Sequence, residues 1–229
     1  MIITVGGIKG GGGKSTAATN LAVMRRHAGN DVLLIDADEQ RSSSEFVSQR
    51  EALGHDPIPC VQLVGAAVRA QVKQLAPRYC DIVIDTGGRD TASQRAALTV
   101  TDIMLVPFQP GNFDLWTLEQ VERLIEEVRS VNEGLEALCF ISRGYSAGAD
   151  NAQAAEMLRN STMLRFIDAP IIGRKAFNTA SGDGLSVIEA KPRDPKAVAE
   201  MQRLYDAVFT GDAAKRVAAR RLDNSKITA

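Results

Sequence analysis

The stretch Lys9-Gly10-Gly11-Gly12-Gly13-Lys14-Ser15-Thr16 separates a short β-branched run, residues 2–5, from residues 14–28, which favour a helix. Glycines in such a loop let backbone N–H groups approach phosphate oxygens without a Cβ in the way. The helix that follows directs its positive end at the same anion. Lys14 is placed to reach the β- and γ-phosphates of a nucleotide, and the Ser15 hydroxyl to ligate Mg²⁺. The stretch therefore predicts an ATP site over residues 9–16, with Mg²⁺ as cofactor.

The rest of the chain repeats the order of strand, loop and helix. Continuous apolar runs predict buried strands at residues 32–35, 81–85, 103–106 and 138–141, with 171–172 as a short further strand. Apolar residues at helical spacing predict helices at 68–75, 115–128 and, after the start signal Asp194-Pro195, 195–208. This alternation predicts an α/β fold with a mostly parallel, twisted sheet and helices on both faces. We expect one domain over residues 1–211 and a basic helix or tail over 212–229.

The composition is that of an ordinary globular protein. The 229 residues are 45% hydrophobic and carry a net charge of −1, so any binding to nucleic acid must come from a local patch. Cys60, Cys80 and Cys139 form no pair typical of a disulfide or zinc site, and we expect Cys80 and Cys139 to be buried. The sequence contains no signal peptide and no apolar run long enough to span a membrane, which predicts a cytoplasmic protein.

The lysine that opens the glycine loop makes a resemblance specific. Lys9-Gly10-Gly11-x-Gly13-Lys14-Ser15 resembles the deviant Walker A motif of the ParA/MinD family of P-loop ATPases. In that family the early lysine reaches across a nucleotide-sandwich dimer to the phosphates held by the other subunit. The resemblance implies catalytic roles for Lys9 and Lys14 and a homodimer that forms with ATP. A second positive charge at the transferred phosphoryl group would stabilise the charge that builds on its oxygens.

Acidic residues follow two of the expected strands, at the strand ends where parallel sheets bind ligands. The segment 36–40, Asp-Ala-Asp-Glu-Gln, resembles the family's D-x-D-P-Q segment, with Glu39 at the proline position. The segment 81–86 resembles the Walker B strand, and Gly87-Gly88 follows it where the family has prolines. The resemblance implies that Asp38 orients or activates the attacking water, that Asp36 supports the Mg²⁺ shell, and that Asp85 approaches Mg²⁺, often through a water.

Later segments extend the resemblance to about residue 209. Residues 102–114, which include Pro107, Pro110 and Asp114, resemble the family stretch A-D-x-x-x-x-P-x-x-P-x-x-x-D. Residues 172–177 and 184–189 resemble its I-x-R-x-x-x-F and G-x-S-V-x-E segments. Because the first expected strand begins at Ile2, the chain is most similar to the small ParA partition proteins without an N-terminal operator-binding domain.

The basic tail bears on which kind of member this is. MinD-like proteins end in an amphipathic helix with bulky apolar residues facing lipid, whereas residues 212–222 here offer only Val217 and Leu222. As a helix, the tail would bring four basic residues within reach of a DNA backbone: Lys215, Arg216, Arg220 and Arg221. An ordinary solvated helix end is the alternative interpretation.

The resemblance therefore implies a ParA-like ATPase of plasmid or chromosome partition or of cargo positioning. ATP would bring two subunits together, and the dimer would bind nucleoid DNA non-specifically. A ParB-like centromere-binding protein or cargo adaptor would stimulate hydrolysis. We expect a cytoplasmic, nucleoid-associated protein without membrane contact. Two alternatives stay open: a metabolic ligase resembling dethiobiotin synthetase, and a MinD-like membrane-associated regulator.

Overall fold

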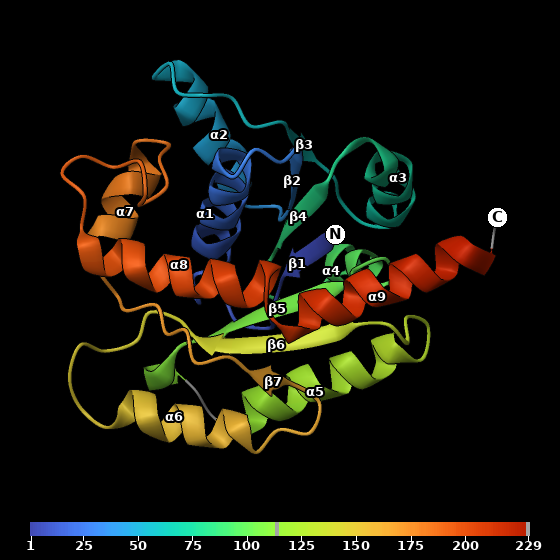
Figure 1. Cartoon of the computed structure of the whole chain (residues 1–229). Helices are drawn as coiled ribbons and strands as arrows, with labels where there is room; N and C mark the ends of the chain where they lie inside the picture. The colour runs from blue at the N-terminus through green and yellow to red at the C-terminus, as the bar shows by residue number, and fades with distance from the viewer. Residues whose placement is uncertain (113–114, 228–229) are drawn as a thin grey trace.

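The computed structural model describes residues 1–112 and 115–227, so Asp114 and the last two positions of the predicted tail lie outside it. Its centre is a seven-stranded sheet whose paired strands all run parallel, in the order β3-β2-β4-β1-β5-β6-β7 (Figure 1). The predicted α/β fold with a parallel sheet is confirmed. The strands are β1 (Ile2–Val5), β2 (Val32–Ala37), β3 (Cys60–Gln62), β4 (Asp81–Thr86), β5 (Ile103–Phe108), β6 (Glu136–Ile141) and β7 (Arg165–Phe166).

Helices cover both faces of the sheet because side chains alternate between the faces along each strand. Ile3 and Val5 point into a core with α1 and α8, whereas Ile2 packs with residues of α3 and α4. Alternate residues of β5 and β6 pack on α5 and α6. The α-helices are α1 (Lys14–His27), α2 (Ser42–Ala52), α3 (Ala67–Leu75), α4 (Ala92–Leu98), α5 (Leu115–Arg129), α6 (Asp150–Arg159), α7 (Lys175–Gly182), α8 (Pro195–Phe209) and α9 (Asp212–Ile227).

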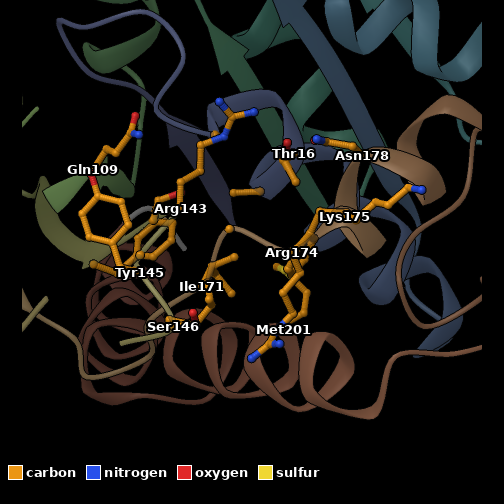
Figure 2. A pocket seen from close by; sticks show the side chains of 18 residues that line it. Thr16, Gln109, Arg143, Tyr145, Ser146, Ile171, Arg174, Lys175, Asn178 and Met201 are labelled. Carbon is orange, nitrogen blue, oxygen red and sulfur yellow. The ribbon is translucent and has the colours of Figure 1, made fainter. Parts of the chain in front are cut away.

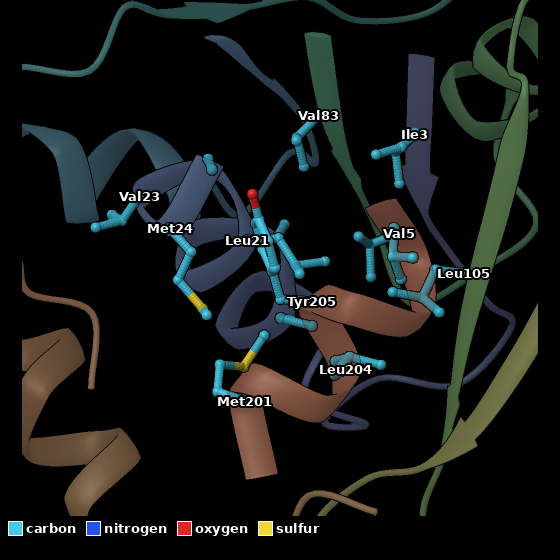
Figure 3. Close-up of a cluster of buried hydrophobic side chains, with 14 of the residues drawn as sticks. Ile3, Val5, Leu21, Val23, Met24, Val83, Leu105, Met201, Leu204 and Tyr205 are labelled. Carbon is cyan, nitrogen blue, oxygen red and sulfur yellow. The ribbon is translucent and has the colours of Figure 1, made fainter. Parts of the chain in front are cut away.

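The core between α1, α8 and the sheet fixes the position of the glycine loop. Figure 3 shows Leu21 of α1 between the strands and α8, with Val5 and Leu105 on the strand side and Leu204 on the helix side. All four side chains are fully buried. Burial of a side chain of this size contributes about 1.5–3 kcal/mol. The helix that begins at Lys14 is thereby held against β1, and the loop between them is held at both ends.

Two local predictions were wrong. Residues 171–172 form no strand: Ile172 makes one isolated bridge to Gly144, and the edge strand is β7. The ladder of β6 stops because Arg143, two residues beyond its end, takes a left-handed conformation with φ 52°. Cys80 is exposed, because it lies in the turn before β4 rather than in the apolar run itself, whereas Cys139 is buried as predicted.

The topology gathers loops at one edge of the sheet. The chain adds β2 and β4 on one side of β1 and β5, β6 and β7 on the other. At such a reversal the loops that leave the carboxyl ends of the strands diverge and leave a crevice for a ligand. Among the described helices, none is long and apolar enough to cross a membrane.

Candidate functional site

The glycine loop connects β1 to α1 and leaves the start of the helix uncapped. Gly11 and Gly13 adopt φ values of 75° and 87°, which glycine reaches without strain. Gly13 is the N-cap of α1 and supplies no side-chain cap, so the first backbone amides face the loop. A Cβ at Gly13 would lie 2.5 Å from the Ser142 hydroxyl oxygen, so the loop is also pressed against the end of β6. Amides in this arrangement suit an anion, which is the ligand that the sequence predicts for this loop.

Lys14 is a cation held inside this site. Its side chain is 7% exposed, and its ammonium donates a hydrogen bond to the Lys9 carbonyl at 2.8 Å. Burial lowers the pKa of Lys14 below its usual value, although the Asp85 and Asp38 carboxylates act in the opposite direction. A buried ammonium beside backbone amides suits a polyanionic ligand such as a nucleoside triphosphate. The negative charge of the ligand would compensate the hydration that the Lys14 ammonium loses on burial.

Two carboxylates lie side by side at the ends of β2 and β4. Asp36 and Asp85 are direct neighbours in the sheet, and both are fully buried. Asp36 accepts hydrogen bonds from the backbone amides of Asp38, at 3.2 Å, and of Ser44, at 2.7 Å. Asp85 accepts from the Ser43 hydroxyl at 2.7 Å, and its Oδ1 has no hydrogen-bond partner among residues 1–112 and 115–227.

The electrostatics of Asp85 suit a cationic ligand. Burial and the neighbouring Asp36 raise the pKa of Asp85 to about 7, against the lowering effect of the Ser43 and Ser15 hydroxyls and of Lys14. A buried carboxylate oxygen without a partner costs stability unless a ligand or metal compensates it. Both oxygens of Asp36 are engaged by backbone amides. Asp85 is therefore the carboxylate that better fits Mg²⁺.

The donor set fits Mg²⁺ held with its nucleotide. The described residues contain no group of three or more His, Cys, Asp or Glu side chains that could hold a metal. Mg²⁺ commonly takes one or two protein oxygens and completes its octahedron with water and phosphate oxygens. Ser15 and Asp85 would supply the protein oxygens, and Mg²⁺ would neutralise charge on the transferred phosphoryl group.

Asp38 lies at the rim of the same hollow. A cavity of about 270 Å³ is lined by residues 10–16 together with Asp38, Gln40 and Gly88. The Asp38 carboxylate is half-buried and accepts from the Gln40 amide at 3.1 Å. A Cβ at Gly87 would come within 3.1 Å of Asp38 Oδ1, and one at Gly88 within 2.5 Å of Gly10 Cα. The glycine pair thus lets the loop after β4 approach both Asp38 and the phosphate loop, where a water-orienting role for Asp38 remains a prediction.

A larger cavity adjoins the phosphate hollow. It has a volume of about 450 Å³ and shares Gly13, Thr16 and Arg143 with the smaller one. Figure 2 shows side chains facing it from the start of α1, from the loop after β6 and from α7, including Thr16, Tyr145 and Asn178. Its size and its continuity with the phosphate hollow suit the nucleoside part of a nucleotide.

Sequence reasoning did not assign the residues of this second cavity. Arg143 lines both hollows, and its φ of 52° is a strained conformation of the kind that collects at functional sites. The signal available in the sequence was the position of Ser142 and Arg143 directly after an apolar strand. Ser43 was also missed, because a serine in a polar helix start carries no pattern of its own.

The predicted tail residues lie far from this site, on α9. Arg216 donates to both carboxylate oxygens of Glu136, at 2.8 and 2.7 Å, and Arg220 pairs with the same carboxylate. Arg221 pairs with Asp102, and exposed Lys215 lies 3.6 Å from Asp212 one turn earlier. The structure places all four on α9, with the arginines against Asp102, just before β5, and Glu136, the first residue of β6. Their role in DNA binding remains a prediction.

A comparison with protein-family models decides the family. Residues 3–187 match the CobQ/CobB/MinD/ParA nucleotide-binding domain. The chain belongs to this family. The match spans the phosphate loop, both acidic strand ends and every lining residue of the larger cavity except Met201, so the hollows described above lie almost wholly within the matched nucleotide-binding domain.

Two characterised relatives narrow the comparison. The chain is 24% identical over 213 residues to maintenance of carboxysome distribution protein A from Halothiobacillus neapolitanus, covering 90% of this chain and 95% of that protein. It is also 24% identical to protein ParA from Rhizobium radiobacter, over 77% of this chain and 80% of that protein. This member of the family is thus similar, at low identity, to proteins of partition and of carboxysome positioning.

Solved structures share its fold. The Cyanothece McdA(D38A)–ATP complex matches with a TM-score of 0.72 at 19% identity, over 90% of this chain and 95% of that one. Cobyrinic acid a,c-diamide synthase from Mycobacterium smegmatis, with a bound ATP analogue and magnesium, matches with a TM-score of 0.73 at 17% identity, over 91% and 93%. Structures with this fold thus hold ATP, or an ATP analogue with Mg²⁺.

Proposed function

We propose that this chain is an Mg²⁺-dependent ATPase that dimerises on ATP, binds nucleoid DNA without sequence specificity and positions a plasmid, chromosome or other cargo. A ParB-like centromere-binding protein or cargo adaptor would stimulate hydrolysis and release the dimer. Because ATP and ADP would favour different association states, hydrolysis would act as a switch.

The observation that carries this proposal is the position of Lys9. Its backbone carbonyl is held by the Lys14 ammonium, while the residue itself is exposed. Lys14 already supplies a buried cation to the phosphate hollow from within the chain. An exposed second lysine in the same loop is suited to meet the phosphates of a second subunit.

An exposed aromatic residue at the start of α5 supports a subunit interface near the phosphate loop. Trp116, in the first turn of α5, is 71% exposed, and its neighbour Thr117 lines a small cavity together with Lys9 and Gly10. Aromatic residues are enriched in interface cores because their large apolar area is removed from water on association. Trp116 is also the single tryptophan of the chain, so its fluorescence reports on this surface alone.

Light scattering with and without ATP and Mg²⁺ tests the switch. We expect ATP to convert the monomer to a dimer, ADP to leave it monomeric, and Trp116 emission to shift to the blue on dimerisation. Lys9→Ala should reduce DNA- and partner-stimulated hydrolysis about 10²-fold, the range typical for one missing transition-state cation, while retaining ATP binding. Lys73→Ala, an exposed lysine on α3, is the matched control.

Three results would count against the proposal. A mass that does not change with nucleotide removes the switch. Turnover of Lys9→Ala equal to that of Lys73→Ala removes Lys9 from the mechanism. If hydrolysis instead required a small carboxylic acid substrate and ignored DNA, the ligase alternative would replace the partition function.

A further inference from the structure

A second polar hollow lies at the opposite end of β6 from the nucleotide site. It has a volume of about 410 Å³ and lies between the end of α5, the start of β6, the end of α6 and β7 (Figure 1). Glu136 begins β6 at this hollow, and Arg143 follows β6 at the nucleotide cavity. A strand rises about 3.3 Å per residue, so the two hollows are roughly 20 Å apart. We call this hollow the arginine groove.

Three arginines line the groove against one carboxylate. The charged lining residues are Arg129, Glu136, Arg159 and Arg165, and the hydroxyls of Ser161 and Thr162 lie among them. Ser161 donates a hydrogen bond at 2.6 Å to Glu122, which lies outside the lining. The Glu122 carboxylate is therefore already engaged. Among the described residues, the cationic side chains of the lining therefore outnumber the acidic ones.

The arginines of the groove are not consumed by internal ion pairs. Arg129 donates to the Leu135 carbonyl and to the Met163 sulfur, and both of these interactions leave its charge uncompensated. Arg159 stacks over the Phe166 ring at 4.9 Å and meets the exposed Asp168 only at 3.8 Å. Arg165 is exposed and forms no ion pair within the described part of the chain.

Helix α9 neutralises the acid of the groove from the other side. Arg216 and Arg220 both reach Glu136, and the Arg216 hydrogen bonds hold the pKa of this carboxyl below its usual value. Glu136 is therefore a charged acid with two cationic partners of its own. Arg165 of the groove also acts on Glu136 through its charge, and Arg129 and Arg159 remain as further cations of the lining that could meet an external anion.

We propose that the arginine groove binds the phosphate backbone of duplex DNA. Planar guanidinium groups recognise phosphate oxygens through paired hydrogen bonds, and the Thr162 hydroxyl adds a neutral donor. A groove lined by several arginines spread over three elements fits a run of phosphates, whereas the acid that it contains is already paired. This proposal rests on the function proposed above and specifies which surface binds the DNA. The groove arginines bind it, and Lys215 at the outer face of α9 does not.

Fluorescence anisotropy with a labelled duplex of arbitrary sequence tests the assignment. The protein is loaded with Mg²⁺ and a non-hydrolysable ATP analogue, and the salt concentration is varied. Arg159→Gln combined with Arg165→Gln should weaken binding about tenfold or more. The double variant should also reduce the slope of log K against log salt by about two, one for each phosphate that is no longer neutralised. Arg165→Gln alone should reduce the slope by about one.

Two matched variants control for the removal of charge. Arg69→Gln removes an exposed arginine from α3, near the β3 end of the sheet, and Lys215→Gln removes an exposed cation from α9. Both should bind DNA as the unchanged protein does. Melting temperature, nucleotide affinity and dimer mass are recorded for every variant, so that a folding defect is separated from a specific defect in DNA binding.

The outcomes distinguish failure of the groove assignment from failure of the proposed DNA function. If the unchanged protein binds nucleotide and dimerises but never retains DNA, the proposed DNA function and the groove assignment both fail. If it retains DNA and the groove variants bind equally well, only the groove assignment fails. Loss of binding in Lys215→Gln with normal binding in Arg165→Gln would transfer the DNA-binding role to the outer face of the tail.

Discussion

The two edges of the sheet hold their charges in opposite ways. At the amino edge, Asp81 and Glu136 each begin a strand and are met by cations. Asp81 lies 2.6 Å from Arg25 Nε and 3.0 Å from the N-terminal ammonium, and Glu136 is bidentate with Arg216. At the carboxyl edge, Asp85 keeps an oxygen that no described residue engages, and Lys14 is a desolvated ammonium.

The difference separates structural from functional charge. Acids that are fully paired inside the chain stabilise the fold and leave nothing for a ligand. Charges left incompletely compensated make the nucleotide-free fold less stable and bind a ligand of opposite charge more tightly. We therefore expect substitutions at the carboxyl edge to abolish activity without loss of stability, and substitutions at the amino edge to do the reverse.

The largest effect is expected at Lys14. Lys14→Gln should lower ATP turnover by about 10²- to 10³-fold, because it removes a cation aimed at the phosphates. The nucleotide-free protein should melt no lower than before, since the amide avoids the desolvation of a buried ammonium. Binding of a fluorescent ATP analogue, phosphate release and thermal melting measure these effects, with Lys73→Gln as the exposed control. If Lys14→Gln melted several degrees below the unchanged protein, Lys14 would stabilise the fold, and the contrast between the two edges of the sheet would be weakened.

Asp85 should couple stability to pH in an unusual direction. Its pKa is raised from an ordinary 3.8 to about 7 in the fold, so the folded chain keeps a proton that the unfolded chain loses. Stability contributed by the protonated form is present below about pH 4 and is lost as pH rises through 7. Asp85→Asn should therefore gain stability relative to the unchanged protein over this window, by up to about 4 kcal/mol, while hydrolysis is lost.

Denaturant unfolding of the nucleotide-free protein at pH 4, 5.5 and 7.5 measures this difference. Asp90→Asn, which alters an exposed carboxylate paired with Arg95, is the control and should show no such trend. A stability difference between Asp85→Asn and the unchanged protein that is the same at all three pH values would contradict the raised pKa.

Asp81 tests the amino edge. Asp81→Asn leaves Arg25 and the N-terminal ammonium without their carboxylate, and loss of one partner of a buried pair costs about 3 kcal/mol. ATP binding measured well below the melting temperature should be unchanged, because Asp81 lies at the far end of β4 from Asp85. Asp31→Asn removes a pair with Arg26 at 3.0 Å in which Asp31 is 70% exposed, and should cost less than about 0.5 kcal/mol. Equal losses in the two variants would falsify the structural role of the amino edge.

Substitution of Glu136 should have the smallest effect on stability. The contribution of Glu136 to stability should depend on pH in the direction opposite to that of Asp85. The hydrogen bonds from Arg216 keep the pKa of Glu136 below its ordinary 4.5, so its stabilising contribution is complete above that pH and is lost as pH falls through the lowered value. Glu136→Gln should be less stable than the unchanged protein by about 1 kcal/mol at pH 7, since Arg216 is partly exposed to solvent. This deficit should shrink below pH 4.5. Glu119→Gln, which removes an exposed ion pair with Arg123 on the same helix, is the control.

Prediction from the sequence succeeded where a pattern was long or chemically specific. Residues 14–28 and 195–208 were placed within a residue or so of α1 and α8, since helical spacing and the Asp194 cap are local signals. Strands β3 and β7 and helices α2, α4, α6 and α7 were missed, because their apolar positions are few and their stability comes from packing against neighbours. The supposed strand at 171–172 failed because an apolar pair does not specify a ladder.

By itself, the sequence determined the parallel α/β architecture, the phosphate loop over residues 9–16 and the acids that follow strands, because spacing, glycine conformation and apolar periodicity are local properties. Tertiary structure decided which of these charges are compensated. Asp36 and Asp85 become neighbours only when β2 pairs with β4, and Arg143 meets the loop only when β6 lies beside β5. The tail arginines, which the sequence predicts to bind DNA, meet Glu136 and Asp102 for the same reason. Compensation depends on distances between residues far apart in the chain, and only the fold sets those distances.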